Sequence, residues 1–83
     1  MNIQEYNKIK QELVGNKFRH FKGHIIIVKD VTIDTENEDY RVIYYHIKDS
    51  SVIWDRPYSM FISKVDREKY PQVEQEYRFQ KID

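Results

Sequence analysis

Apolar side chains at the start of the chain follow helical spacing. In the stretch "NIQEYNKIKQELVG" they recur three or four residues apart, at Ile3, Tyr6, Ile9 and Leu13. Asn2 is a residue type that caps helix N-termini, and Gly15 suits the left-handed conformation in which many helices end. The pattern therefore predicts one amphipathic helix within residues 1–15.

After Gly15 the apolar pattern changes to a period of two, which is typical of strands. The stretch "HIIIVKDVTI" alternates and is β-branched, which predicts one face made of Ile25, Ile27, Val31 and Ile33. The other face is predicted to hold Ile26, Val28 and Thr32. Because both faces are apolar at its start, we expect this strand to be central in its sheet or strongly curved.

Two more strands are predicted to follow this one. The polar stretch "DTENEDY" separates it from "YRVIYYHI", in which both faces are again apolar or aromatic. The two segments are therefore the arms of a long hairpin. A turn at "KDSS" then leads into a third strand at "VIW".

The remaining pattern completes a small β-rich fold. The third strand ends near Pro57, which has no N–H for a ladder hydrogen bond, and a short helical turn is predicted near residues 57–61. "EYRFQKI" predicts a last strand and "KFRHF" a first one. About five short strands that must hide their edges favour closure, so the fold class is mainly β, as a small barrel with one N-terminal helix.

Length and charge narrow the classes of function. The chain has 83 residues, enough for a single small core. Its fourteen basic side chains are balanced by fourteen acidic ones, so no net field draws it to nucleic acid or anionic lipid. The absence of cysteine excludes disulfides and thiolate metal sites, and suits a reducing compartment.

No targeting segment is recognisable in the sequence. The opening "MNIQEYNKIKQELV" is polar and helical, unlike a signal peptide, and the longest aliphatic run, "IIIV", is far shorter than a membrane span. We therefore expect a cytoplasmic protein with no membrane partner.

Three sequence blocks, "FRHFKG", "DTENEDYRVIYY" and "IWDRPYSMF", stand in the order found in a known family. They resemble the small bacterial and phage family DUF1653, whose function is unknown, over about residues 16–82. The resemblance implies an SH3-like barrel over residues 16–83, with the helix of residues 1–15 outside it. It implies no reaction or substrate, but it does imply defined roles for Arg19, His20, Lys22, Gly23, Trp54, Arg56, Pro57, Met60 and Phe61. The chain departs from the family in lacking a glycine in the loop before Trp54 and in having Asp55 after it.

Within these blocks, five residues are candidates for a binding site: Arg19, His20, Lys22, Trp54 and Arg56. An aromatic face beside a guanidinium group suits a planar or anionic ligand. The alternative is a structural role, in which Phe18 and Phe21 fill the barrel ends and the basic side chains are solvated or paired with the acidic loop. Arg56 is then held by a carboxylate such as Asp55 or by backbone carbonyls beside Pro57.

Catalytic and metal sites have weaker support. Ser59 or Ser63 with His20 or His46 supplies the right groups for hydrolysis, but nothing in the sequence places them together, so no catalytic residue is assigned. The three histidines show no close spacing on one element, and we expect neither a metal nor a cofactor.

These observations leave three hypotheses. The first is a non-catalytic binding module with an aromatic and basic groove for a protein segment or a small anionic ligand. The second is a nucleic-acid accessory domain that uses the early basic residues Lys17, Arg19, Lys22 and Lys29. The third is a small enzyme for an anionic metabolite, with His20 as acid or base. The N-terminal helix is predicted to be a lid over one barrel end or a dimer contact, which leaves a monomer or a homodimer.

Overall fold

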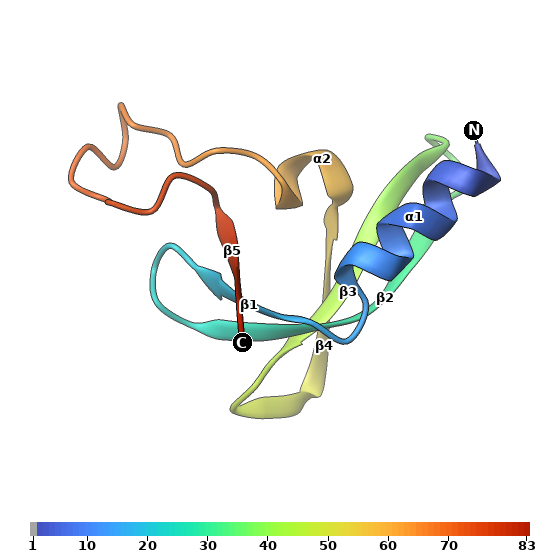
Figure 1. Ribbon diagram of the computed structural model, residues 1–83, viewed down its shortest axis with the longest axis horizontal. Helices are drawn as coiled ribbons and strands as arrows, with labels where there is room; N and C mark the ends of the chain where they lie inside the picture. Colours follow the sequence, from blue (N-terminus) through green and yellow to red (C-terminus); the bar gives the residue numbers. More distant parts are fainter. Residues whose placement is uncertain (1) are drawn as a thin grey trace.

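The computed structural model describes residues 2–83, and its elements follow the predicted order (Figure 1). They are α1 (Ile3–Leu13), β1 (Lys17–His20), β2 (Ile25–Asp34), β3 (Asp39–His46), β4 (Asp49–Pro57), α2 (Tyr58–Phe61) and β5 (Phe79–Ile82). The prediction of a mainly β fold with one N-terminal helix is confirmed. The short helix predicted after the strand at "VIW" is also confirmed. The final strand is shorter than the pattern indicated, and β4 is longer.

All five strands form one antiparallel sheet in the order β4-β3-β2-β1-β5. Since β4 and β5 each have one neighbour, the sheet is bent without closing, and it approximates the predicted SH3-like barrel. β4 follows β3 regularly from Trp54 to Pro57 but shifts register between Trp54 and Asp49. Register shifts of this kind bend an edge strand and make it a poorer template for further pairing.

The N-terminal helix begins and ends as its sequence predicts. The Asn2 Oδ1 atom accepts hydrogen bonds from the backbone N–H groups of Gln4 and Glu5, at 2.8 and 3.3 Å. Gly15 has φ +83°, the left-handed conformation that favours glycine. The helix packs against β2 and buries Ile9 and Leu13 in the same core as the strands.

Both predicted faces of β2 are wrong beyond Lys29, where Val31 is buried and Thr32 is exposed. The ladder between β2 and β3 pairs Val28 with Tyr44 and Asp30 with Ile43, so Lys29 is an extra residue in a β-bulge. A bulge of one residue reverses the alternation beyond it. Val31 therefore joins Ile26 and Val28 on the buried face, and all three side chains are fully buried.

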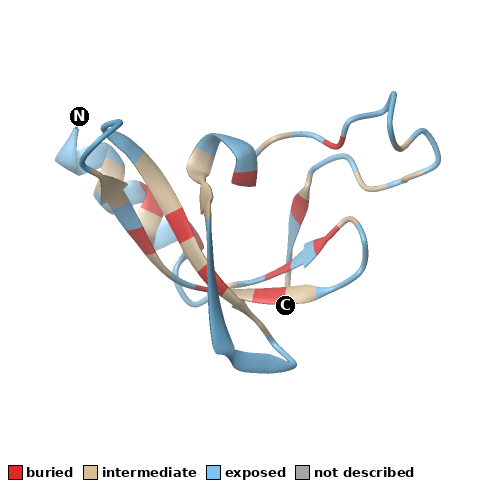
Figure 2. Ribbon diagram, turned by 180° about the vertical axis from the view of Figure 1, so that it is seen from behind, coloured by how far each residue is buried: buried red, intermediate tan, exposed pale blue. Residues whose placement is uncertain are grey.

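The core lies on the concave side of the bent sheet, under α1 and α2 (Figures 1 and 2). Its centre is aromatic: Phe61 of α2 stacks on Phe79 of β5 at 4.3 Å between ring centroids and meets Phe18 of β1 edge-on at 5.2 Å. Phe18 thus has a structural role, but it lies at the centre of the core and not at a barrel end as the structural alternative predicted. None of the helices in residues 2–83 is long and apolar enough to cross a membrane.

Candidate functional site

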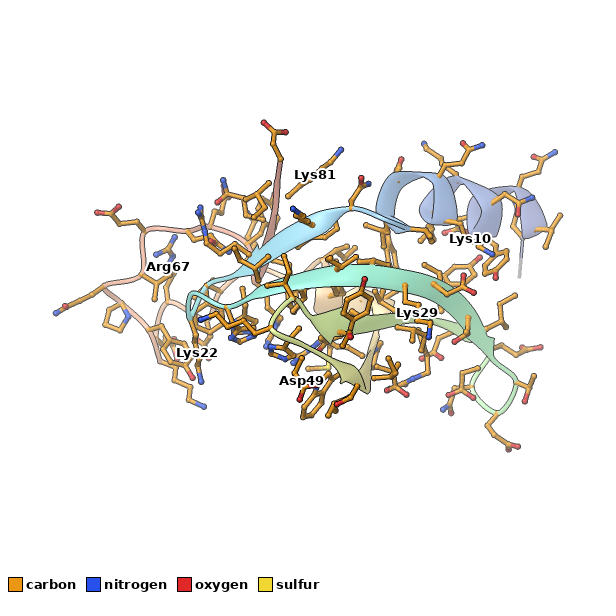
Figure 3. All side chains as sticks on the ribbon, turned by 90° about the horizontal axis from the view of Figure 1, so that it is seen from below. Lys10, Lys22, Lys29, Asp49, Arg67 and Lys81 are labelled. Carbon is orange, nitrogen blue, oxygen red and sulfur yellow. The ribbon has the colours of Figure 1, made fainter. Side chains whose placement is uncertain are left out.

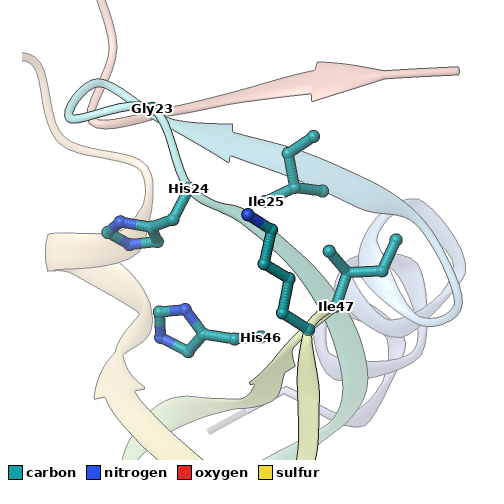
Figure 4. A pocket seen from close by; sticks show the side chains of 6 residues that line it. Gly23, His24, Ile25, His46 and Ile47 are labelled. Carbon is teal, nitrogen blue, oxygen red and sulfur yellow. The ribbon is translucent and has the colours of Figure 1, made fainter.

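A row of stacked rings crosses one end of the sheet. His20 lies between Phe21 and His24, with ring centroids 4.4 and 4.5 Å away, and His24 is followed by His46 at 4.6 Å. Trp54 meets His46 edge-on at 5.7 Å. Figure 4 shows how His24, before β2, and His46, at the end of β3, bring their rings together from separate elements.

His20, His24 and His46, which we call the histidine row, have stacked rings. His20 and His24 are nearly parallel, with 10° between their ring planes, and His24 and His46 are tilted by 33°. Because the lone pairs and N–H bonds of an imidazole lie in its ring plane, stacked rings direct them away from the stacking axis instead of toward one another. No group of three or more histidine, aspartate or glutamate side chains within residues 2–83 is arranged to hold a metal ion.

His20 is buried and held as a neutral imidazole. Only 6% of the residue is exposed, and its Nδ1 atom accepts a hydrogen bond from the backbone N–H of Lys22 at 3.1 Å. Burial lowers the pKa of His20 to about 4, and the nearby charges of His24, Arg56, Arg78 and Lys22 act in the same direction. The ring is therefore an acceptor at Nδ1 and carries its proton at Nε2 at neutral pH.

A cavity of about 300 Å³ lies beside His20. Its walls come from the β1–β2 turn, the end of β4 and the connection between α2 and β5, and are formed by His20, Phe21, Lys22, Arg56, Val65, Asp66, Lys69, Tyr70 and Arg78. We call it the cationic pocket, because four of these side chains are basic. Figure 3 shows Lys22 at the same end of the molecule as Arg67, far from the helix residue Lys10.

The single carboxylate in the cationic pocket is already engaged. Asp66 Oδ1 accepts hydrogen bonds from the backbone N–H groups of Glu68 and Lys69, at 3.0 and 3.4 Å. The ion pairs formed by residues 2–83 are Lys10 with Asp30, Arg41 with Asp55, and Lys64 with Glu76. The four cations of the pocket take no part in them.

The two arginines of the pocket are positioned by neutral groups. Arg56 Nε lies 3.5 Å from the Tyr44 hydroxyl, and its guanidinium stands over the Phe79 ring at 5.7 Å. Arg78 Nε donates to Ser63 Oγ at 3.2 Å. The predicted structural pair between Arg56 and Asp55 is wrong, because the Asp55 carboxylate binds Arg41 at 2.7 Å.

The structure brings three of the five candidate residues into the cationic pocket, His20, Lys22 and Arg56. Arg19 alternates to the exposed face of β1, where its Nε lies 3.5 Å from Gln75 Oε1. Trp54 lines a different cavity, two residues before Arg56 on β4. Lys69 and Tyr70 were missed because they lie in a polar connection without a hydrophobic period. Arg78 was missed because its place in the predicted last strand gave no reason to put it beside His20.

The early basic residues do not form one surface. Lys17 and Arg19 are exposed on β1, whereas Lys22 belongs to the cationic pocket. Lys29 lies at the β2 bulge, well separated from Lys22 (Figure 3). A continuous basic track, which nucleic-acid binding by these residues requires, is therefore absent from this set.

The molecule is a small open-sheet β protein with an unpaired cationic pocket at one end of the sheet. The sequence model of DUF1653, described as a protein of unknown function, matches residues 16–81, and the chain belongs to this family. The predicted resemblance is confirmed, and the match contains every residue of the cationic pocket. Comparison with curated proteins and with solved structures found no match.

Proposed function

We propose that this protein is a non-catalytic binding module whose ligand places an anionic group in the cationic pocket. The observation that carries the proposal is the gathering of Lys22, Arg56, Lys69 and Arg78 around one cavity without an ion-pair partner. Like charges held together repel one another, and a bound anion removes this cost while accepting their hydrogen bonds.

The arginines favour a ligand whose anionic group presents two oxygens to one guanidinium, such as a carboxylate or a phosphate. Arginine side chains present planar forks that match such groups, and both arginines of the pocket are partly buried and positioned. Phe21 and Tyr70 meet edge-on at 4.9 Å along the pocket wall, and Lys22 stands over the Tyr70 ring at 5.5 Å. The wall is thus partly aromatic, which suits a small organic anion or an acidic side chain of a partner protein.

The same geometry supports binding over catalysis. His20 is neutral and already accepts the Lys22 N–H at Nδ1, so one of its two nitrogens is occupied. Ser63 Oγ donates to the Met60 carbonyl at 2.6 Å and accepts from Arg78, which leaves no histidine as its base. The His20 Nδ1 atom and the Ser63 hydroxyl are thus both engaged within the protein, which favours structural roles for them.

A titration of isotope-labelled protein with inorganic phosphate at low salt tests this proposal. Amide chemical shifts are expected to move at residues 20–22, 56 and 66–70, which surround the cationic pocket. Arg56→Gln and Arg78→Gln are each expected to weaken phosphate binding about tenfold, since each removes one charge-assisted hydrogen bond.

The matched control for this titration is Lys8→Gln. Lys8 is exposed on α1, so this variant loses the same charge without touching the cationic pocket. Equal weakening by Lys8→Gln would mean that phosphate responds only to net charge, which contradicts the proposal. Shifts spread over Lys17, Arg19 and Lys29 with a steep salt dependence would instead support the nucleic-acid hypothesis.

A further inference from the structure

Trp54 is an exposed aromatic side chain on β4, two residues before Arg56 of the cationic pocket. It is the single tryptophan of the chain, and 49% of the residue is exposed. It does not belong to the aromatic core. One side of its ring meets His46 edge-on. The indole also lines a second cavity of about 300 Å³, together with His46, Lys48, Asp49 and Val52.

Trp54 and Arg56 project from the same face of β4. Trp54 lies opposite Tyr44 and Arg56 lies opposite Val42, and both of these partners point into the concave side of the sheet. Two residues along a strand span about 7 Å. The two side chains therefore leave β4 on the same face about 7 Å apart, the indole lining the second cavity and the guanidinium the cationic pocket.

We propose that the ligand is a small phosphate monoester of a planar ring, with the chemistry of a nucleoside monophosphate. Its phosphate occupies the cationic pocket beside Arg56, and its ring stacks on the exposed indole of Trp54. This inference rests on the proposed function, because it assigns the anion to the same pocket. The spacing of about 7 Å between Trp54 and Arg56 along β4 is comparable to the distance that one sugar sets between a base and its phosphate.

The second cavity offers groups that suit the edge of a nucleobase. Asp49 provides a carboxylate, fixed by hydrogen bonds from the Ser51 N–H at 3.0 Å and the Ser51 hydroxyl at 2.5 Å. Lys48 provides a donor, and Val52 provides apolar surface with 42% of the residue exposed. A flat ring with donors and acceptors on its rim fits this lining better than an aliphatic chain does.

Because Trp54 is the single tryptophan, its fluorescence reports directly on a ring stacked against it. We would titrate the protein with adenosine monophosphate, ribose 5-phosphate and inorganic phosphate, following fluorescence and the heat of binding. Adenosine monophosphate is expected to bind about tenfold more tightly than ribose 5-phosphate, since stacking of one base on an aromatic side chain contributes this much or more. It is also expected to quench the tryptophan emission, whereas the two ring-free phosphates leave it nearly unchanged.

The Trp54→Leu variant separates this inference from the proposed function. It keeps an apolar side chain against His46 and removes the stacking surface. We expect it to bind all three phosphates with similar affinity, close to that of inorganic phosphate with the unchanged protein. Tyr77→Leu is the matched control, since Tyr77 is an aromatic residue with similar exposure, 45%, outside both cavities.

The outcomes are distinct. Binding of inorganic phosphate without any preference for adenosine monophosphate would overturn the assignment of the ring to Trp54 and leave the cationic pocket standing. Equal losses in Trp54→Leu and Tyr77→Leu would also overturn it. Failure of every phosphate to bind would remove the proposed function together with this inference.

Discussion

Replacing Phe61 with alanine is expected to remove about half of the free energy of unfolding of the protein. Only 2% of Phe61 is exposed, and its ring contacts the rings of Phe18, Tyr44 and Phe79 at the centre of the core. Truncating a buried phenylalanine typically costs about 3–5 kcal/mol. A domain of this size has a total free energy of unfolding of roughly 5–10 kcal/mol, so the loss removes about half of it.

The free energy of unfolding, measured by urea titration with circular dichroism detection, checks this prediction. Met60→Ala is the control, because Met60 precedes Phe61 on the same short helix and is 44% exposed. It is expected to cost less than about 1 kcal/mol. Similar losses in the two variants would mean that Phe61 is not the centre of the core.

The helix and the strands could be predicted because each depends on local spacing. Asn2 and Gly15 mark the ends of α1, and alternating β-branched residues mark β2. The face to which Val31 points could not be predicted, since the bulge at Lys29 shifts the ladder by one residue and lysine gives no signal for it. Closure of the sheet was expected from the number of strands alone, and the structure leaves β4 and β5 as its two edges.

The candidate site was partly predictable for a different reason. His20, Lys22 and Arg56 lie in two of the three family-like blocks, so the resemblance singled them out without any knowledge of their positions in space. Lys69 and Arg78 belong to the long connection between α2 and β5. They line the cationic pocket only because this connection folds back against the sheet. It is held by backbone contacts such as that from the Arg78 N–H to the Ser63 carbonyl at 2.9 Å. Such contacts leave no periodic signal in a sequence.

The stacking of the three histidines could not be predicted from the sequence either. His20, His24 and His46 are unrelated in sequence spacing, and their proximity depends on the turn after β1 and on the pairing of His46 with Ile26. Sequence spacing argued against a shared metal site, yet it gave no hint that the three rings stack. The burial of His20 within this row has a consequence for stability, because it keeps the imidazole neutral beside several cations.

We expect the free energy of unfolding to fall by about 2–3 kcal/mol as the pH falls from 7 to 4, through His20. In the folded protein burial lowers the pKa of His20 to about 4, whereas the unfolded chain has the ordinary value of 6.5. Between these values the unfolded state binds a proton that the folded state does not, so unfolding is favoured as the pH falls. The groups that face His20 from every side, His24, Lys22, Arg56 and Arg78, carry or gain positive charge, and His24 itself has a pKa lowered chiefly by burial.

A titration of the imidazole proton resonances should place the pKa of His20 well below that of a free histidine. Urea unfolding at a series of pH values should then show a smaller slope in His20→Asn, whose side-chain oxygen can accept the Lys22 N–H in place of Nδ1 but does not titrate. The comparison uses the change in stability with pH, because the substitution also alters packing against Phe79. An unchanged slope in His20→Asn would show that other groups cause the acid sensitivity, and a His20 pKa above 6 would show that the ring is not buried among cations as described.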